Sequence, residues 1–344
     1  MRSFLQRKGV SLSVRTYVIT ALSYMALGLF SSLIIGLIIK TAGEQAVALG
    51  LGNLDFLVDM GSYAMETKIM GGAIGVAIAY GLNAPPLVLF SALFAGAFGA
   101  ELGGPAGSYI TALFATEFGK VVYKTTRVDI IVTPFVTIFI GFAVGTFIGP
   151  PINTSMVWFG DIINWSTEQQ PLIMGMLVAV LMGWGLTAPI SSLAIAIMLS
   201  IDGLAAGAAT IGCAAQMVGF AAASYRDNGF GGILAQGIGT SMLQIANVLK
   251  KPIIILPPTI SGAVLAPIAT VWLSMSNNDL GAGMGTSGLV GQIMTFETMG
   301  FSWEVLWSMM ALHVVGPAII SLIIAEWFRK KGWIKPGDMT IIYE

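Results

Sequence analysis

Residues 79–110 read AYGLNAPPLVLFSALFAGAFGAELGGPAGSYI, and this stretch decides which kind of fold the chain can adopt. An apolar run over 85–101 leads into the glycine-rich segment 99–107, and a second apolar run follows over 104–124. Glycine permits backbone conformations that end a helix and let other groups approach closely. In a bilayer, interrupted backbone is tolerated only where it is buried in protein or lines a wet cavity. The stretch therefore predicts short helices packed inside a membrane protein.

The composition of the whole chain agrees with this prediction. Of its 344 residues, 56% are hydrophobic and 10% are charged, and the mean hydropathy is +0.86. A soluble domain carries roughly 25% charged residues, so this chain has too few to cover a water-facing surface. The apolar windows Tyr17–Ile39, Ile130–Gly149 and Ile253–Met275 reach the ~20 residues that span a hydrocarbon core. We predict an all-α, polytopic membrane protein.

Basic residues mark the side of the membrane on which the ends of the chain lie. They cluster before the first span and near the C-terminus, at Arg2, Arg7, Lys8 and Arg15 and at Arg329, Lys330, Lys331 and Lys335. Positive charge favours the cytoplasmic side, so we expect cytoplasmic segments at 1–16 and 329–344 around a transmembrane domain at 17–328. No small-residue cleavage site follows the first basic cluster, which predicts a retained helix. The net charge of −1 argues against a nucleic-acid partner.

Apolar periodicity and Gly or Pro breaks predict about ten spans, some of them half-helices or re-entrant pieces. After the first span, the expected helices are 46–66, 69–83, 85–101, 104–124, 130–149, 170–187, 189–201, 203–224, 235–249, 252–275 and 303–328. The segment SYRDNGFGG, from residue 224, is expected to form a charged turn. Pro85, Pro189, Pro134 and Pro258 are expected to break helices.

An internal repeat supports a duplicated unit. MGGAIGVAIAYGLNAP at 70–85 matches MGMLVAVLMGWGLTAP at 174–189, and RVDIIVTP at 127–134 parallels KKPIIILPP at 250–258. We expect repeated halves at about 70–150 and 174–275, in either parallel or inverted orientation. Duplicated halves with Gly- or Pro-interrupted segments are typical of transporters.

A second glycine-rich segment, GAGMGTSG at 281–288, is too rich in glycine for a spanning helix. We expect a re-entrant hairpin whose backbone N–H groups face a bound solute. Replacing Gly283 and Gly285 with Val is then expected to abolish binding without unfolding the protein. Close helix packing is the alternative explanation for these glycines.

The candidate substrate contacts are gathered at the two glycine-rich segments, where we expect the solute to bind between the halves. The first set is Asn83, Glu101, Gly103, Gly104, Gly283, Gly285, Thr286, Ser287 and Gln292, and further candidates are Asn278, Asp279, Thr133, Thr187 and His313. Glu101 could contact substrate or carry a proton, because charges inside apolar windows are costly.

Other chemistry-bearing residues favour structural roles. Asp202 fits a helix cap, and Cys213 and His313 fit buried packing positions. One histidine and one cysteine cannot form a conventional metal site. We predict no metal, no cofactor and no catalytic residue in this chain.

The quoted blocks, together with TRVDIIVTPFVTIFIG, KKPIIILPPTISGAVLAPI and GAGMGTSGLVGQ, resemble the IIC-like membrane proteins of the bacterial phosphotransferase system. The resemblance spans roughly residues 15 to 330 and is closest to the compact second IIC-like group of Gram-positive bacteria. It implies a homodimer in the cell membrane that binds a sugar and carries it inward. It also implies separate IIA and IIB proteins that deliver the phosphate.

Two other functions remain open from the sequence. A phosphate-independent secondary transporter of a small organic anion, coupled to H⁺ or Na⁺, suits the N–H-rich turns equally well. A membrane sensor or regulator would bind a ligand without moving it.

Overall fold

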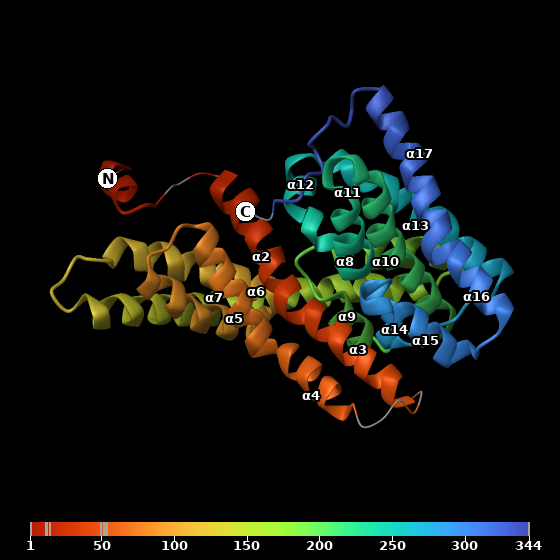
Figure 1. Cartoon of the computed structure of the whole chain (residues 1–344), viewed down its shortest axis with the longest axis horizontal. Helices are drawn as coiled ribbons and strands as arrows, with labels where there is room; N and C mark the ends of the chain where they lie inside the picture. The colour runs from red at the N-terminus through yellow and green to blue at the C-terminus, as the bar shows by residue number, and fades with distance from the viewer. Residues whose placement is uncertain (1, 11–12, 14, 49, 51–53, 343–344) are drawn as a thin grey trace. The chain divides into compact units, whose positions relative to one another are not determined.

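The computed structural model describes residues 2–10, 13, 15–48, 50 and 54–342, and this part of the chain is helical with no β-strand (Figure 1). Among the described residues, six helices are long and apolar enough to cross a membrane: Thr16–Val47, Pro86–Val122, Asp129–Thr167, Gly203–Ala223, Pro252–Trp272 and Trp303–Lys330. Pro171–Thr187 is a shorter apolar helix. The prediction of an all-α, polytopic membrane protein is confirmed.

The chain divides into two compact units, residues 1–156 and 157–344. One of the two matching sequence segments lies in each unit, at α5 (Thr67–Gly81) and at α8 (Pro171–Thr187). Both helices end shortly before a proline, Pro85 or Pro189, as predicted. The duplication and its boundaries stay predictions.

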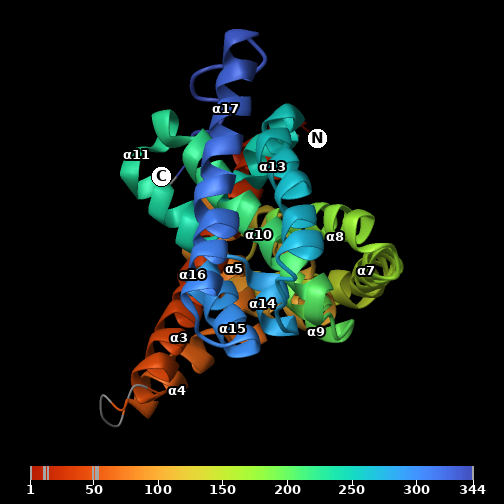
Figure 2. The same cartoon turned by 90° about the vertical axis from the view of Figure 1, so that its right-hand side faces the viewer.

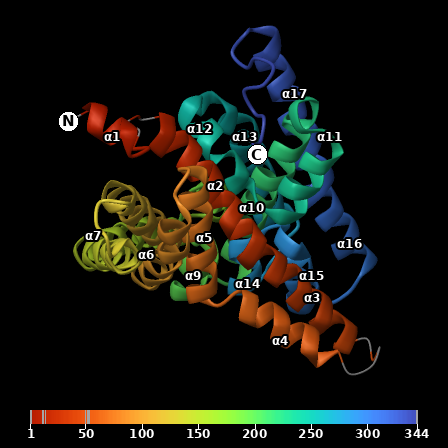
Figure 3. The same ribbon diagram turned by 60° about the vertical axis from the view of Figure 1, so that its left-hand side comes forward.

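The first unit begins with α1 (Arg2–Arg7) and a long helix formed by η1 (Arg15–Thr20), α2 (Ala21–Leu29), η2 (Phe30–Ile34) and α3 (Ile35–Ala48). Helix α4 (Asp55–Ala64) folds back beside α3 (Figure 3). Gly36 and Gly61 allow this contact, since a Cβ on Gly61 would lie 2.5 Å from the Gly36 carbonyl oxygen. The single helix predicted over 46–66 is therefore wrong in its bounds; residues 49 and 51–53 of that range lie outside the described residues.

Helix α6 (Pro86–Val122) is a helical hairpin with two antiparallel arms. The chain reverses at Gly103 and Gly104, and Gly104 has the positive φ of +56° that glycine tolerates best. The arms pack tightly, because Thr111 Oγ1 donates to the Ala95 carbonyl at 2.8 Å and a Cβ on Gly99 would clash with the second arm. The bounds predicted from sequence, 85–101 and 104–124, match the two arms closely.

Helix α7 (Asp129–Thr167) runs along the α6 hairpin, where Gly141 and Gly145 meet Ala95 and Phe98. It continues through Pro150 well beyond the end predicted at residue 149. The prediction that Pro134 breaks a helix is also wrong, since α7 continues through it, whereas Pro258 lies in the first turn of α13 (Leu256–Pro267).

The second unit is built around α10 (Gly203–Ala223), a helix of small residues buried on nearly all sides. Helices α8, α13 and α17 (Gly316–Lys330) pack against it, and Figure 2 shows α17 and α13 beside it. Small residues make this packing possible: a Cβ on Gly212 would lie 2.0 Å from the Ala179 carbonyl oxygen of α8. Helix α16 (Trp303–Met309) and η8 (Met310–Val315) lead into α17.

Shorter elements complete the second unit. They are α9 (Ser192–Met198), α11 (Tyr225–Leu234), η3 (Ala235–Gly239), η4 (Ser241–Gln244), α12 (Ile245–Lys250), η5 (Pro252–Ile255), η6 (Ile268–Trp272), α14 (Asp279–Met284), η7 (Ser287–Leu289) and α15 (Val290–Met299). Two predictions are corrected here. The expected helix over 235–249 is broken at Thr240, whose backbone is extended, and most of the expected charged turn SYRDNGFGG is helix α11.

Candidate functional site

The segment 281–288 forms a buried turn between two short helices. Helix α14 ends at Met284, and positive φ angles at Gly285, Gly288 and Leu289 turn the chain into α15. All eight residues of the segment are buried. Within the described chain, the backbone N–H groups of Gly285 and Thr286 donate to no acceptor. Buried N–H groups nearly always have a partner, so this turn is suited to hold a ligand oxygen.

The turn faces a second segment with the same sequence pattern. Gly-x-Gly-Thr-Ser occurs at 237–241 as GIGTS and at 283–287 as GMGTS. Thr286 Oγ1 donates to the Gly237 carbonyl at 2.5 Å, and Ser287 Oγ donates to the Gly239 carbonyl at 2.7 Å. The sequence interpretation missed residues 237–241, although the repeated five-residue pattern is a readable signal.

Further buried hydroxyls and amides continue from Ser241. Its Oγ lies 2.8 Å from Thr187 Oγ1, which is 3.4 Å from Gln216 Oε1. Gln216 Nε2 donates to Thr259 Oγ1 at 2.9 Å. We call Thr187, Gln216, Ser241, Thr259, Thr286 and Ser287 the hydroxyl–amide cluster; each is at most 9% exposed, and none carries a full charge.

Gln292 and His313 form a separate buried pair in the same unit. Gln292 Nε2 lies 3.1 Å from His313 Nδ1. Gln292 Oε1 is buried and has no hydrogen-bond partner among the described residues. An unpaired buried carbonyl oxygen is costly, so it is a candidate acceptor for a ligand hydroxyl.

The residues before the turn serve its structure. Asn277 Nδ2 is buried and donates to Thr210, Thr295 and the Gly291 carbonyl. Asn278 caps α14 by accepting from Gly281 N at 3.0 Å. The Asp279 carboxylate accepts from its neighbour Leu280 N. These bonds fix the chain at the start of α14.

The glycines of the turn are needed for packing as well as for its backbone conformation. A Cβ on Gly283 would lie 2.5 Å from Leu193 Cα, and a Cβ on Gly285 would lie 2.6 Å from Ala214 N. Valine at these positions would displace backbone, which disagrees with the expectation that such a variant stays folded. Cys213 is buried beside the turn, with Sγ 3.5 Å from the Ala282 carbonyl oxygen, and fits the predicted packing role.

The predicted residues of the first unit occupy different places. Glu101 forms an exposed ion pair with Lys68 at 3.1 Å, beside Gly103 and Gly104 at the hairpin tip. Asn83 follows α5 with a φ of +54° and lines a cavity with several cationic residues. Thr133 donates to Asp129 at 2.7 Å in the first turns of α7.

Two other carboxylates lie in apolar segments, those of Glu117 and Asp202. Glu117 is buried and pairs with Lys120 at 3.0 Å. Asp202 precedes α10 at the capping position, but its side chain makes no capping hydrogen bond, so that prediction is wrong in its mechanism.

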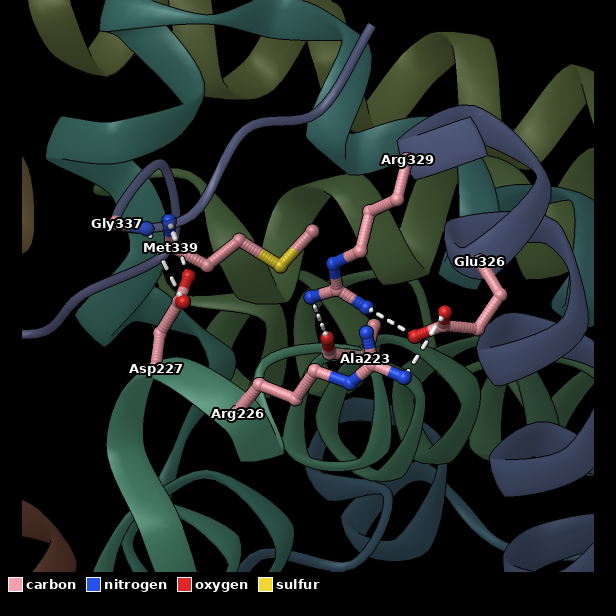
Figure 4. Close-up of polar contacts among 7 residues, drawn as sticks. All are labelled: Ala223, Arg226, Asp227, Glu326, Arg329, Gly337 and Met339. Atoms are coloured by element: carbon pink, nitrogen blue, oxygen red, sulfur yellow. Dashed lines mark hydrogen bonds and ion pairs between the residues drawn. The ribbon is translucent and has the colours of Figure 1, made fainter. Parts of the chain in front are cut away.

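The C-terminal segment of the chain docks onto the second unit near the broken helix 235–250. Figure 4 shows Asp227 accepting from the backbone N–H groups of Gly337 and Met339, each at 3.1 Å. In the same view the Arg329 guanidinium donates to the Glu326 carboxylate at 2.8 Å and to the Ala223 carbonyl at 2.6 Å. The Asp227 bonds hold residues 337–339 against α11, and the Arg329 bonds join α17 to the end of α10.

Comparison with known proteins assigns the family. The family profile described as "Phosphotransferase system, EIIC" matches residues 19–341, nearly the whole chain. Neither the curated proteins nor the solved structures include a significant match. A chain with several membrane-spanning helices and this family match is a membrane component of that system. The protein belongs to the EIIC family of the phosphotransferase system.

Proposed function

We propose that this protein carries a neutral sugar across the bacterial cell membrane, and that the sugar binds at the hydroxyl–amide cluster. The observation that carries the proposal is the pairing of the two Gly-x-Gly-Thr-Ser segments through Thr286 and Ser287. Broken helical segments at membrane depth are typical of transporter binding sites.

The chemistry of the cluster favours a sugar over an anion. Hydroxyls and amides both donate and accept, which matches the hydroxyl groups of a sugar. The unpaired N–H groups of Gly285 and Thr286 add two donors at the turn, and Gln292 Oε1, in its separate pair with His313, offers a further acceptor in the same unit. An anion would gain most from Lys or Arg, and the cluster contains neither.

Solute entry requires movement, because the cluster is buried on all sides. We infer that the segments 235–241 and 285–289 separate when the solute enters and close around it. Phosphate transfer to the sugar is then the task of separate IIA and IIB proteins. A homodimer is part of the proposal, and light scattering on the purified protein measures it.

The experiment is sugar counterflow in liposomes that contain the purified full-length protein. Sugars, sugar alcohols and small organic acids are screened first by the thermal shift each produces. Counterflow then compares the wild type with the double variant Thr187→Val/Ser241→Ala, whose two hydroxyls bond to each other. The control is Thr298→Val, whose hydroxyl bonds to the Met294 carbonyl on an exposed helix face.

The proposal expects sugar flux in the wild type and the control, and at least tenfold less flux in the double variant with its unfolding temperature retained. Flux of an organic acid but of no sugar would contradict it and identify a secondary carrier. Ligand binding with no flux would instead identify a sensor.

A further inference from the structure

The first unit contains a cavity of about 580 Å³ that is independent of the hydroxyl–amide cluster. Its lining includes Arg7, Lys8, Asn83, Lys120, Tyr123 and Lys124. These residues come from the chain around α1, the end of α5 and the end of α6. Both ends of the α6 hairpin meet here, because its arms are antiparallel.

Backbone carbonyls hold two of the ammonium groups in place. Lys8 Nζ donates to the Tyr123 carbonyl at 2.5 Å. Lys120 Nζ donates to the Leu82 carbonyl at 2.9 Å and to Glu117 Oε1 at 3.0 Å. An ammonium group has three donors, so Lys8 keeps two and Lys120 keeps one for a further acceptor.

Lys124 is the third ammonium group. Its Nζ lies 5.2 Å from the centroid of the Tyr123 ring. Its backbone has a φ of +54°, and its N–H donates to Asp129 Oδ1 at 2.7 Å, which fixes the turn that carries it. The side chain therefore belongs to an ordered turn beside the cavity.

Positive charge exceeds negative charge around the cavity. Glu117 is paired with Lys120, and Asp129 accepts from the Lys124 backbone. Within the described part of the chain, no carboxylate lies within 4 Å of the ammonium groups of Lys8 or Lys124. Like charges held close together repel one another, and an anion between them removes that repulsion.

We propose that this cavity binds a phosphate group. Phosphate offers several acceptor oxygens to the remaining ammonium donors, and Lys is a common ligand for it. The Asn83 amide supplies a further donor at the cavity wall. Basic pockets between membrane helices on the cytoplasmic side bind anionic lipid headgroups, so the phosphate can belong to a lipid or to a soluble molecule.

The test uses the full-length protein and two probes. Native mass spectrometry in detergent measures retention of phosphatidylglycerol against phosphatidylcholine. Thermal shift measures inorganic phosphate against chloride at equal ionic strength. The test variant is Lys8→Gln/Lys124→Gln, which removes two charges and leaves the buried Glu117–Lys120 pair intact. The matched control is Lys330→Gln/Lys331→Gln, two exposed residues in the second unit.

The expected result is retention of phosphatidylglycerol, or a saturable shift with inorganic phosphate, that is roughly 30-fold weaker in Lys8→Gln/Lys124→Gln. Selective lipid retention identifies a headgroup as the source, and a phosphate shift without it identifies a soluble source. Absence of both, or equal loss in the two double variants, overturns the proposal.

Discussion

Gln244 Nε2 donates to Gln236 Oε1 at 2.8 Å and also to the Met339 carbonyl at 2.9 Å. Gln236 directly precedes Gly237, the residue that accepts the hydrogen bond from Thr286. A single buried amide therefore connects the C-terminal segment to the segment that faces the glycine-rich turn.

Removing this amide should weaken the second unit. Gln244→Ala leaves Gln236 Oε1 without its donor and the Met339 carbonyl with one donor fewer. We expect a loss of about 1–3 kcal/mol in the free energy of unfolding. Chemical denaturation in detergent measures this loss. Gln169→Ala is the control, because the hydrogen bond from the Gln169 side-chain amide is exposed. Equal effects of the two substitutions would show that Gln244 has no special role.

The pair of Lys251 and Asp338 predicts a pH dependence for docking of the C-terminal segment. Partial burial opposes ionisation of Asp338. Two hydrogen bonds favour it, from Lys251 Nζ at 2.5 Å and from the Lys335 backbone N–H, and so do the charges of Lys251 and Lys250. Together these effects outweigh the burial. The pKa of Asp338 is thus held below its ordinary value. A lowered pKa in the folded state stabilises the protein at a pH above the ordinary aspartate pKa of about 3.9. This contribution disappears as the pH falls through the lowered pKa of the folded state.

The measurement is the unfolding temperature of the wild type and of Asp338→Asn between pH 7 and pH 3. The wild type should be more stable at pH 7, and the difference should shrink toward pH 3. The exposed Asp161→Asn serves as control. A difference that stays constant across this range would assign the effect to packing.

Gly285→Ala should destabilise the protein, because the residue has a φ of +55° and a Cβ would contact Ala214 N at 2.6 Å. The strained backbone conformation alone should lower the free energy of unfolding of the alanine variant by about 1–3 kcal/mol. Gly231→Ala in α11 meets no atom within 4 Å and should be neutral or slightly stabilising. Thermal unfolding compares the two. A stable Gly285→Ala protein would mean that the turn adjusts around the new methyl group.

Lys120→Met should destabilise the first unit by about 3–5 kcal/mol, because it leaves the buried Glu117 carboxylate without its cationic partner. Lys68→Met removes an exposed pair with Glu101 and should change stability by about 0–1 kcal/mol. Adding Glu117→Gln to Lys120→Met should recover most of the loss. Failure of this recovery would indicate that the Lys120 bond to the Leu82 carbonyl dominates.

Much of the fold was predictable because apolar runs and glycine breaks act locally. The two arms of α6 and the bounds of α8 and α10 followed from such breaks. The continuation of α7 through Pro150 and Pro151 could not be predicted in this way. The packing of a long apolar helix outweighs the low helix propensity of proline. The break at Thr240 was missed because no proline interrupts residues 235–249, although Gly237 and Gly239 directly precede it.

The candidate site was predictable in composition but not in its contacts. The turn at 281–288 could be recognised from glycine content alone. Its partner at 237–241, and the roles of Gln216 and Ser241, depend on which segments meet in space. Within the first unit, Asn83 lines a basic cavity and Glu101 forms an exposed ion pair, and their grouping with the turn stays a prediction.

The reversal of α6 at Gly103 and Gly104 also constrains how the chain is threaded through the bilayer. Because the arms are antiparallel, a hairpin inserted in a bilayer returns the chain at Val122 to the side that it left at Pro86, whether or not the tip reaches the far side. The hairpin adds an even number of crossings, so it never changes the sidedness of the later helices. Reporter domains fused before Pro86 and after Val122 must give the same signal, and a topology that counts these 37 residues as one crossing inverts everything downstream.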